Sequence, residues 1–91
     1  MIVTLEEARQ YLRLDSSDED DFITGLIAMG EQMSADIARV SIEQLAKETK
    51  MARISILYVV AYLYEHREEA DHGDLAQTLR SLLFGIRREV F

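Results

Sequence analysis

Apolar positions in the first part of the chain recur at the spacing of a helix. The sequence "TLEE" at residues 4–7 has the form of a capping box, with Thr4 and Glu7 as the two capping side chains. Apolar residues then follow every three or four positions. We therefore predict a helix over residues 4–13.

A second helix is predicted to start within the acidic stretch "LDSSDEDDF" at residues 14–22. Its cap is predicted to be Ser16 together with Glu19. Ser17 with Asp20 is an equivalent alternative, and acidic residues in a first turn are favoured by the helix dipole. The apolar stripe of this helix is predicted to consist of Phe22, Ile23, Leu26, Ile27, Met33 and Ile37.

Further cap and loop signals predict three more helical segments. Ser41 with Gln44 predicts a short helix within "RVSIEQLAKETK", and Thr49 is the predicted cap of the helix that follows. Gly73 in "EEADHGD" has the position of a left-handed loop residue, after which Asp74 opens a last helix. The buried face of the last helix is predicted to consist of Leu75, Leu79, Leu82, Leu83, Ile86 and Val90.

The segment 54–64, "ISILYVVAYLY", is apolar on every side except for Ser55. It continues into "EHREEA" without a turn residue, so its length favours a helix over a strand. Such a helix is usually surrounded by other helices, and a chain of this length contains few of them. Tyr58, Tyr62 and Tyr64 are therefore candidates for contact with another subunit. An ordinary monomeric core is the alternative.

The whole pattern predicts one all-α domain over residues 1–91, with three longer helices and one or two short ones. Proline is absent and there are only four glycines, so few residues interrupt a helix. A hydrophobic content of 48% is enough for a packed core and excludes a disordered chain. The absence of cysteine excludes a disulfide framework.

Charge argues against direct DNA binding, because the net charge is −7 and residues 1–50 hold eleven acidic against five basic side chains. A helix-turn-helix protein would need a basic recognition helix, and the last helix is the only candidate. No apolar run reaches the roughly 18 residues of a membrane span, and the N-terminal residues do not resemble a signal peptide. We expect no sequence-specific nucleic acid binding and no membrane partner.

No metal, cofactor or catalytic pattern is recognisable. Counted from Asp15, the sixth and twelfth positions of a calcium loop hold Asp20 and Leu26 instead of glycine and glutamate. His66 and His72 are six residues apart, which does not match the spacing of a helical zinc site. No catalytic triad, glycine-rich phosphate loop or cysteine nucleophile can be assembled. We expect no cofactor and no enzymatic activity.

The C-terminal segment 79–91 combines basic and apolar residues and is a candidate docking arm. Its predicted partner-binding residues are Arg80, Arg87, Arg88, Val90 and Phe91. In the alternative, the final aromatic ring folds back onto the core of its own subunit.

Three stretches occur in an order that resembles a known family: "VTLEEARQYLRLDSSDEDDFITGLIAMGE" at 3–31, "ISILYVVAYLYEHREEA" at 54–70 and "LRSLLFGIRR" at 79–88. Together they resemble the small head–tail connector proteins of tailed bacteriophages, which are also described as DNA-packaging proteins. The family's central helix closes on a Tyr-Glu-x-Arg pattern, which is matched here by Tyr64, Glu65 and Arg67.

The resemblance implies a homo-oligomeric ring of about twelve subunits between the portal protein and the tail or a second neck protein. The ring extends the DNA channel in the virion, and its subunits are made in the host cytoplasm during assembly or from a prophage. It implies a portal contact by the C-terminal segment. Candidates for the acidic channel lining are Asp18, Glu19, Asp20 and Asp21, and candidates for subunit contacts are Tyr58, Tyr62, Tyr64 and Arg67. The competing hypothesis is a small acidic helical adaptor or regulator that acts as a dimer.

Overall fold

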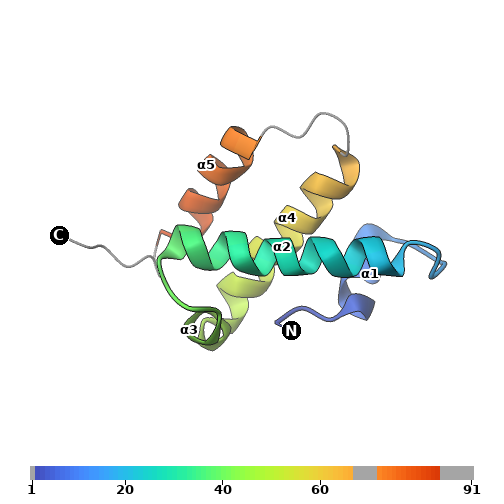
Figure 1. The fold of residues 1–91 in the computed structure, drawn as a ribbon, viewed down its shortest axis with the longest axis horizontal. Coiled ribbons are helices and arrows are strands. Elements are labelled where there is room, and N and C mark those ends of the chain that lie inside the picture. Colours follow the sequence, from blue (N-terminus) through green and yellow to red (C-terminus); the bar gives the residue numbers. More distant parts are fainter. Residues whose placement is uncertain (1, 67–71, 85–91) are drawn as a thin grey trace.

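The computed structural model describes residues 2–66 and 72–84, and these residues form five helices and no strand (Figure 1). The all-α prediction is therefore confirmed. The helices are α1 (Leu5–Leu12), α2 (Asp20–Ala38), α3 (Ile42–Lys47), α4 (Thr49–Glu65) and α5 (His72–Leu82). The three longer helices, α2, α4 and α5, have 19, 17 and 11 residues, while α1 and α3 have 8 and 6.

Helices α2 and α4 form the centre of the fold. In Figure 1, α2 crosses in front of α4, and each of the other three helices contacts both of them. The Cα atoms extend over 46 × 28 × 16 Å, so the subunit is a thin slab. The two central helices bury their facing sides against each other, and their outer sides therefore point away from each other.

The closest approach of the two central helices is at Gly30 of α2 and Ile56 of α4. A Cβ atom at position 30 would lie 3.2 Å from the Ile56 carbonyl oxygen and 3.2 Å from its Cγ2 atom. One turn further along α2, the hydroxyl groups of Ser34 and Ser55 are 3.0 Å apart and fully buried. Small side chains thus let the two backbones pack directly against each other.

The predicted apolar stripes are largely buried. Of the stripe on α2, Ile23, Leu26 and Ile27 are buried and Met33 and Ile37 are half-buried. Phe22 corrects the prediction, because it lies at the first turn of α2 with 41% of its surface exposed. In the last segment Leu75, Leu79 and Leu83 are buried and Leu82 is half-buried, while Ile86 and Val90 lie outside the described residues.

Two of the predicted caps are confirmed. In α1 the Glu7 amide donates to the Thr4 hydroxyl, and the Glu7 carboxylate accepts from the Thr4 amide. In α3 the same reciprocal pair is made by Ser41 and Gln44. Both pairs satisfy backbone donors that have no partner inside the helix.

Three local predictions are wrong. The residue before α2 is Glu19, which makes no side-chain cap, because the preceding turn is closed instead by the Asp20 amide and the Ser17 carbonyl. Thr49 does not cap α4, because it is already helical and its hydroxyl donates to the carbonyl of Ala46. Gly73 is also helical, since α5 begins at His72.

The left-handed residues that end α1 and α2 are arginines, Arg13 and Arg39, each with φ near 60°. After each of them, the next amide donates back to the carbonyl five residues earlier, from Leu14 in one case and Val40 in the other. This is the hydrogen bonding of a Schellman motif, in which glycine is the usual residue. The chain therefore turns sharply at two positions that carry no glycine.

Candidate interaction surfaces

The acidic residues at the start of α2 differ in their surroundings, because some of them contact other helices and others face solvent. Glu19 accepts a hydrogen bond of 2.6 Å from the hydroxyl of Tyr64, at the end of α4. The Tyr64 ring also lies against Phe22, with ring centroids 6.3 Å apart. Tyr64, predicted as a subunit contact, is thus half-buried inside its own subunit.

Asp20 faces α1, where its carboxylate lies 3.7 Å from Nε of Arg9. A second ion pair, between Glu7 and Arg53, joins α1 to α4. Asp18 and Asp21 are exposed. Of the four acidic residues predicted to line a channel, two are therefore engaged within the subunit and two face solvent.

Helix α4 keeps one apolar side open although it contacts all four other helices. Ile54 is 45% exposed, and Leu57, Tyr58 and Ala61 are half-buried beside it at helical spacing. We call this surface, together with the exposed Lys50, the outer face of α4.

A row of stacked rings adjoins the outer face of α4. The rings of Tyr58 and Tyr62 are 6.4 Å apart, and those of Tyr62 and His66 are 4.4 Å apart and nearly parallel. Nδ1 of His66 also lies 2.8 Å from the Tyr62 carbonyl oxygen. Both of these tyrosines are half-buried, so the structure leaves part of each ring open to a neighbour.

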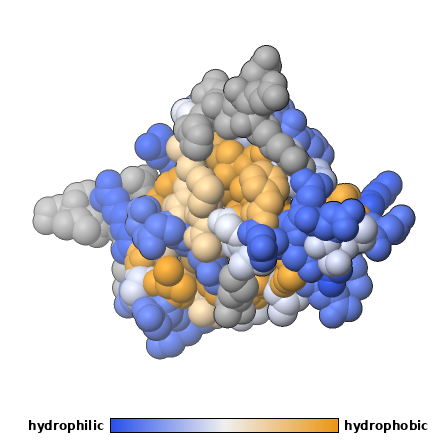
Figure 2. Space-filling model, turned by 45° about the vertical axis from the view of Figure 1, so that its right-hand side comes forward, coloured by the Kyte–Doolittle hydropathy of each residue, from blue (hydrophilic) through white to orange (hydrophobic). Residues whose placement is uncertain are grey.

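The opposite side of the slab presents the outer face of α2, which consists of the exposed residues Gly25, Ala28, Met29, Gln32 and Asp36. Met29 is 47% exposed, and nothing lies within 4 Å of a Cβ atom built at Gly25. Helix α2 contains four carboxylates and no basic residue. Figure 2 shows that the apolar surface on one side of the molecule is bordered by hydrophilic residues.

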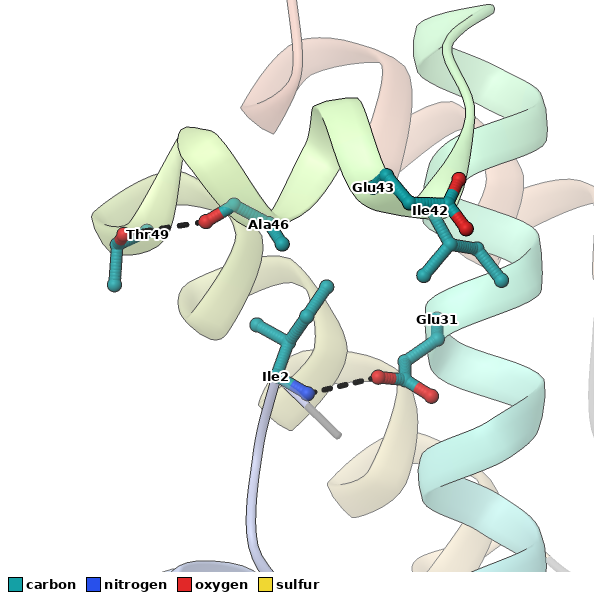
Figure 3. Close-up of a pocket in the computed structure, with 6 residues that line it drawn as sticks. All are labelled: Ile2, Glu31, Ile42, Glu43, Ala46 and Thr49. Atoms are coloured by element: carbon teal, nitrogen blue, oxygen red, sulfur yellow. Dashed lines mark hydrogen bonds between the residues drawn. The ribbon is translucent and has the colours of Figure 1, made fainter.

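A shallow hollow of about 320 Å³ lies between α2 and α3 (Figure 3). The side chain of Ile2 extends toward α3, and its backbone amide donates a hydrogen bond of 2.8 Å to Glu31 of α2. Ile42, Glu43, Ala46 and Thr49 complete the lining. The bond between Ile2 and Glu31 holds the start of the chain against the central helix.

The predicted C-terminal docking arm lies mostly beyond the described residues. Arg80 is exposed on α5, and Phe84 is 76% exposed just after that helix. Phe84 was not among the predicted partner residues, although an aromatic ring beside a basic segment is a signal that sequence reasoning could have used. The other predicted residues, Arg67, Arg87, Arg88, Val90 and Phe91, lie outside the described residues.

Within residues 2–66 and 72–84, no three metal-binding side chains come together. In the same part of the chain, no helix is long and apolar enough to cross a membrane. The features that stand out are therefore surfaces: two outer helix faces, an acidic turn and an exposed aromatic ring next to α5.

A comparison with protein families shows to which family the chain belongs. Residues 2–90 match the family described as "Phage gp6-like head-tail connector protein". Searches of curated proteins and of solved structures gave no significant match. Because the family match covers nearly the whole chain, this protein belongs to the phage gp6-like head-tail connectors, which are structural and not enzymatic components of the virion.

Proposed function

We propose that the protein forms a closed ring of about twelve copies between the portal and the tail, where it extends the DNA channel and completes the head. The family supports a structural role in the neck and contacts with other head and tail proteins. The observation that carries the ring is the outer face of α4. Helix α4 contacts every other described helix and still exposes Ile54 and parts of two tyrosine rings.

When a neighbour covers an exposed side chain such as Ile54, the assembly is stabilised by about 25 cal/mol for each Å² of apolar surface removed from water. The subunit itself has no further helix among the described residues to supply that cover. A second copy of the same chain is the simplest source, since most soluble oligomers are symmetric assemblies of identical subunits.

We propose that the acidic turn before α2 faces the DNA channel. Asp18 and Asp21 are the residues that bear this role, because Glu19 and Asp20 are engaged by Tyr64 and Arg9. A negative wall repels the DNA phosphates and lets the double helix pass without binding. Mapping of these carboxylates to the outer wall of a ring would contradict this assignment.

We propose that the C-terminal segment 79–91 docks on the portal, with the basic residues Arg80, Arg87 and Arg88 and the apolar residues Val90 and Phe91 as the contacts. The exposure of Arg80 and Phe84 supports a contact surface at this end of α5. During assembly the subunit would be free in the host cytoplasm, and in the virion it would be held between the portal and the tail or a second neck protein.

The first test is light scattering on size-exclusion fractions over a wide range of protein concentrations. We expect a discrete species near twelve subunits. A stable dimer would contradict the ring and favour the adaptor hypothesis.

The second test removes residues 87–91 and measures folding, assembly and binding to the portal protein of the same phage. We expect the truncated chain to keep its helical circular dichroism and its ring but to lose portal binding. A matched control replaces the same five residues by an uncharged Gly/Ser segment of equal length, which should behave like the truncation. Unfolding of the truncated chain would instead place the tail in the core.

A further inference from the structure

Two exposed apolar surfaces lie on opposite sides of the slab. One is the outer face of α2, with Met29, and the other is the outer face of α4, with Ile54. The buried sides of these helices meet at Gly30 and Ile56, so the outer faces point in opposite directions. A molecule with different apolar surfaces on its two sides can bind copies of itself on both.

We infer that the outer face of α2 in one subunit packs against the outer face of α4 in the next, head to tail around the ring. This inference rests on the proposed function and assigns the contact that builds the ring. Each subunit uses both faces once, so the contact repeats until the rotation closes.

The shapes of the two faces support this pairing. At the middle of the α2 face, Gly25 and Ala28 leave a low surface, and the space around Gly25 is open. On the α4 face, Ile54 is 45% exposed, and the half-buried Leu57 and Tyr58 lie one turn further along the helix. A bulky side chain of one helix fits over small residues of another, as in ridges-into-grooves packing.

Glycine at position 25 has no explanation within the subunit. Glycine in a helix interior is less favourable than alanine by about 1 kcal/mol, and no neighbouring atom of the subunit would obstruct a Cβ at this position. A close approach by a helix from another copy would explain why the residue at this position has no side chain.

The charge of the α2 face fits the N-terminal end of the α4 face. The α2 face carries Asp36, and α2 as a whole has no basic residue to balance its carboxylates. The exposed Lys50 lies at the start of the α4 face, and the exposed Glu65 lies at the far end of that helix. Pairing α2 with α4 can place a carboxylate opposite Lys50, whereas pairing α2 with α2 would bring acidic residues against acidic residues.

Cross-linking tests the inference directly, because the natural chain has no cysteine and every thiol would be an introduced one. The full-length variants are Ala28→Cys on α2, Ile54→Cys on α4 and a double variant with both. Gln77→Cys on α5 is the matched control at another exposed site. A short bis-maleimide reagent is added at concentrations where light scattering reports the oligomer, and circular dichroism checks that each variant is folded.

We expect a cross-linked dimer when the Ala28→Cys and Ile54→Cys proteins are mixed, and little product from either one alone. The double variant should give a ladder of products up to the full ring. The Gln77→Cys protein should cross-link with neither partner.

Self-cross-linking of Ile54→Cys alone would overturn the head-to-tail contact and indicate a two-fold dimer. A ring seen by light scattering without any product between positions 28 and 54 would overturn this contact and leave the proposed function intact. A chain that stays monomeric at all concentrations and gives no product would contradict both.

Discussion

The hydroxyl group of Tyr64 lies 2.6 Å from Oε1 of Glu19, so the last turn of α4 is bonded to the residue that precedes α2. The two residues are 45 positions apart in the chain. Since Glu19 makes no side-chain cap for α2, this contact orders the acidic turn in place of a cap. It also holds the ring of Tyr64 against Phe22.

Replacing Tyr64 by phenylalanine should therefore lower the free energy of unfolding by about 1.5–3 kcal/mol, the range for a hydrogen bond to a charged group. Urea unfolding at neutral pH measures the change. Tyr58→Phe is the matched control, because Tyr58 is half-buried in the same helix and its described contact is a ring stack, which phenylalanine keeps. Equal losses for the two variants would show that the bond to Glu19 contributes nothing.

The two glycines of α2 should respond to alanine in opposite ways. Gly30→Ala should destabilise the subunit by about 1 kcal/mol or more, because the new Cβ would press on the backbone of Ile56. Gly25→Ala should stabilise it by about 1 kcal/mol, because the space there is open and alanine favours the helix. Unfolding should be measured below the concentration of assembly, since association adds to apparent stability. A Gly30→Ala variant that is as stable as the natural chain or more so would refute the packing at position 30.

The buried hydroxyl pair of Ser34 and Ser55 should show strong coupling. Ser55 Oγ lies 3.0 Å from both Ser34 Oγ and the Ala52 carbonyl oxygen, so Ser34 can donate to Ser55 while Ser55 donates to Ala52. Ser55→Ala leaves the buried Ser34 hydroxyl without this partner and should cost about 1–3 kcal/mol, whereas Ser34→Ala should cost less because Ser55 keeps its bond to the Ala52 carbonyl. The double change should lose less than the sum of the single changes, as measured by a double-mutant cycle. Additive losses would mean that the two hydroxyls do not interact.

Arg39→Gly should raise stability by about 0.5–1 kcal/mol, because the left-handed backbone at the end of α2 is strained for a residue with a Cβ atom. Arg39→Ala is the control, since it removes the charge and keeps the Cβ. Thermal unfolding of the two variants separates the effects. A gain with alanine equal to that with glycine would attribute the effect to charge and not to backbone strain.

Local signals explain why much of the fold was predictable from the sequence. The capping boxes at Thr4 and Ser41 involve residues three apart, so the pattern alone defines them. The helix ends at Arg13 and Arg39 could not be predicted, because a left-handed arginine has no sequence signature. The turn before α2 could not be predicted either, because Glu19 there is bonded to Tyr64, far away in the chain, and no local pattern contains that contact.

The interaction surfaces were only partly predictable for a related reason. The sequence shows that residues 54–64 are apolar all round, but a helix without a polar side does not reveal which of its sides faces outward. The structure identifies Ile54 as the exposed position and places Tyr64 inward, against Phe22. Tyr58 and Tyr62 remain predictions for the subunit contact.

The crossing of α2 and α4 at Gly30 and Ile56 also has a consequence for the size of the assembly. The two outer faces belong to these two helices, so the packing at the crossing sets the angle between the faces. In a ring built through those faces, this angle determines the curvature and hence the number of subunits that close the circle. The absence of a Cβ atom at Gly30 would then help to determine the diameter of the channel.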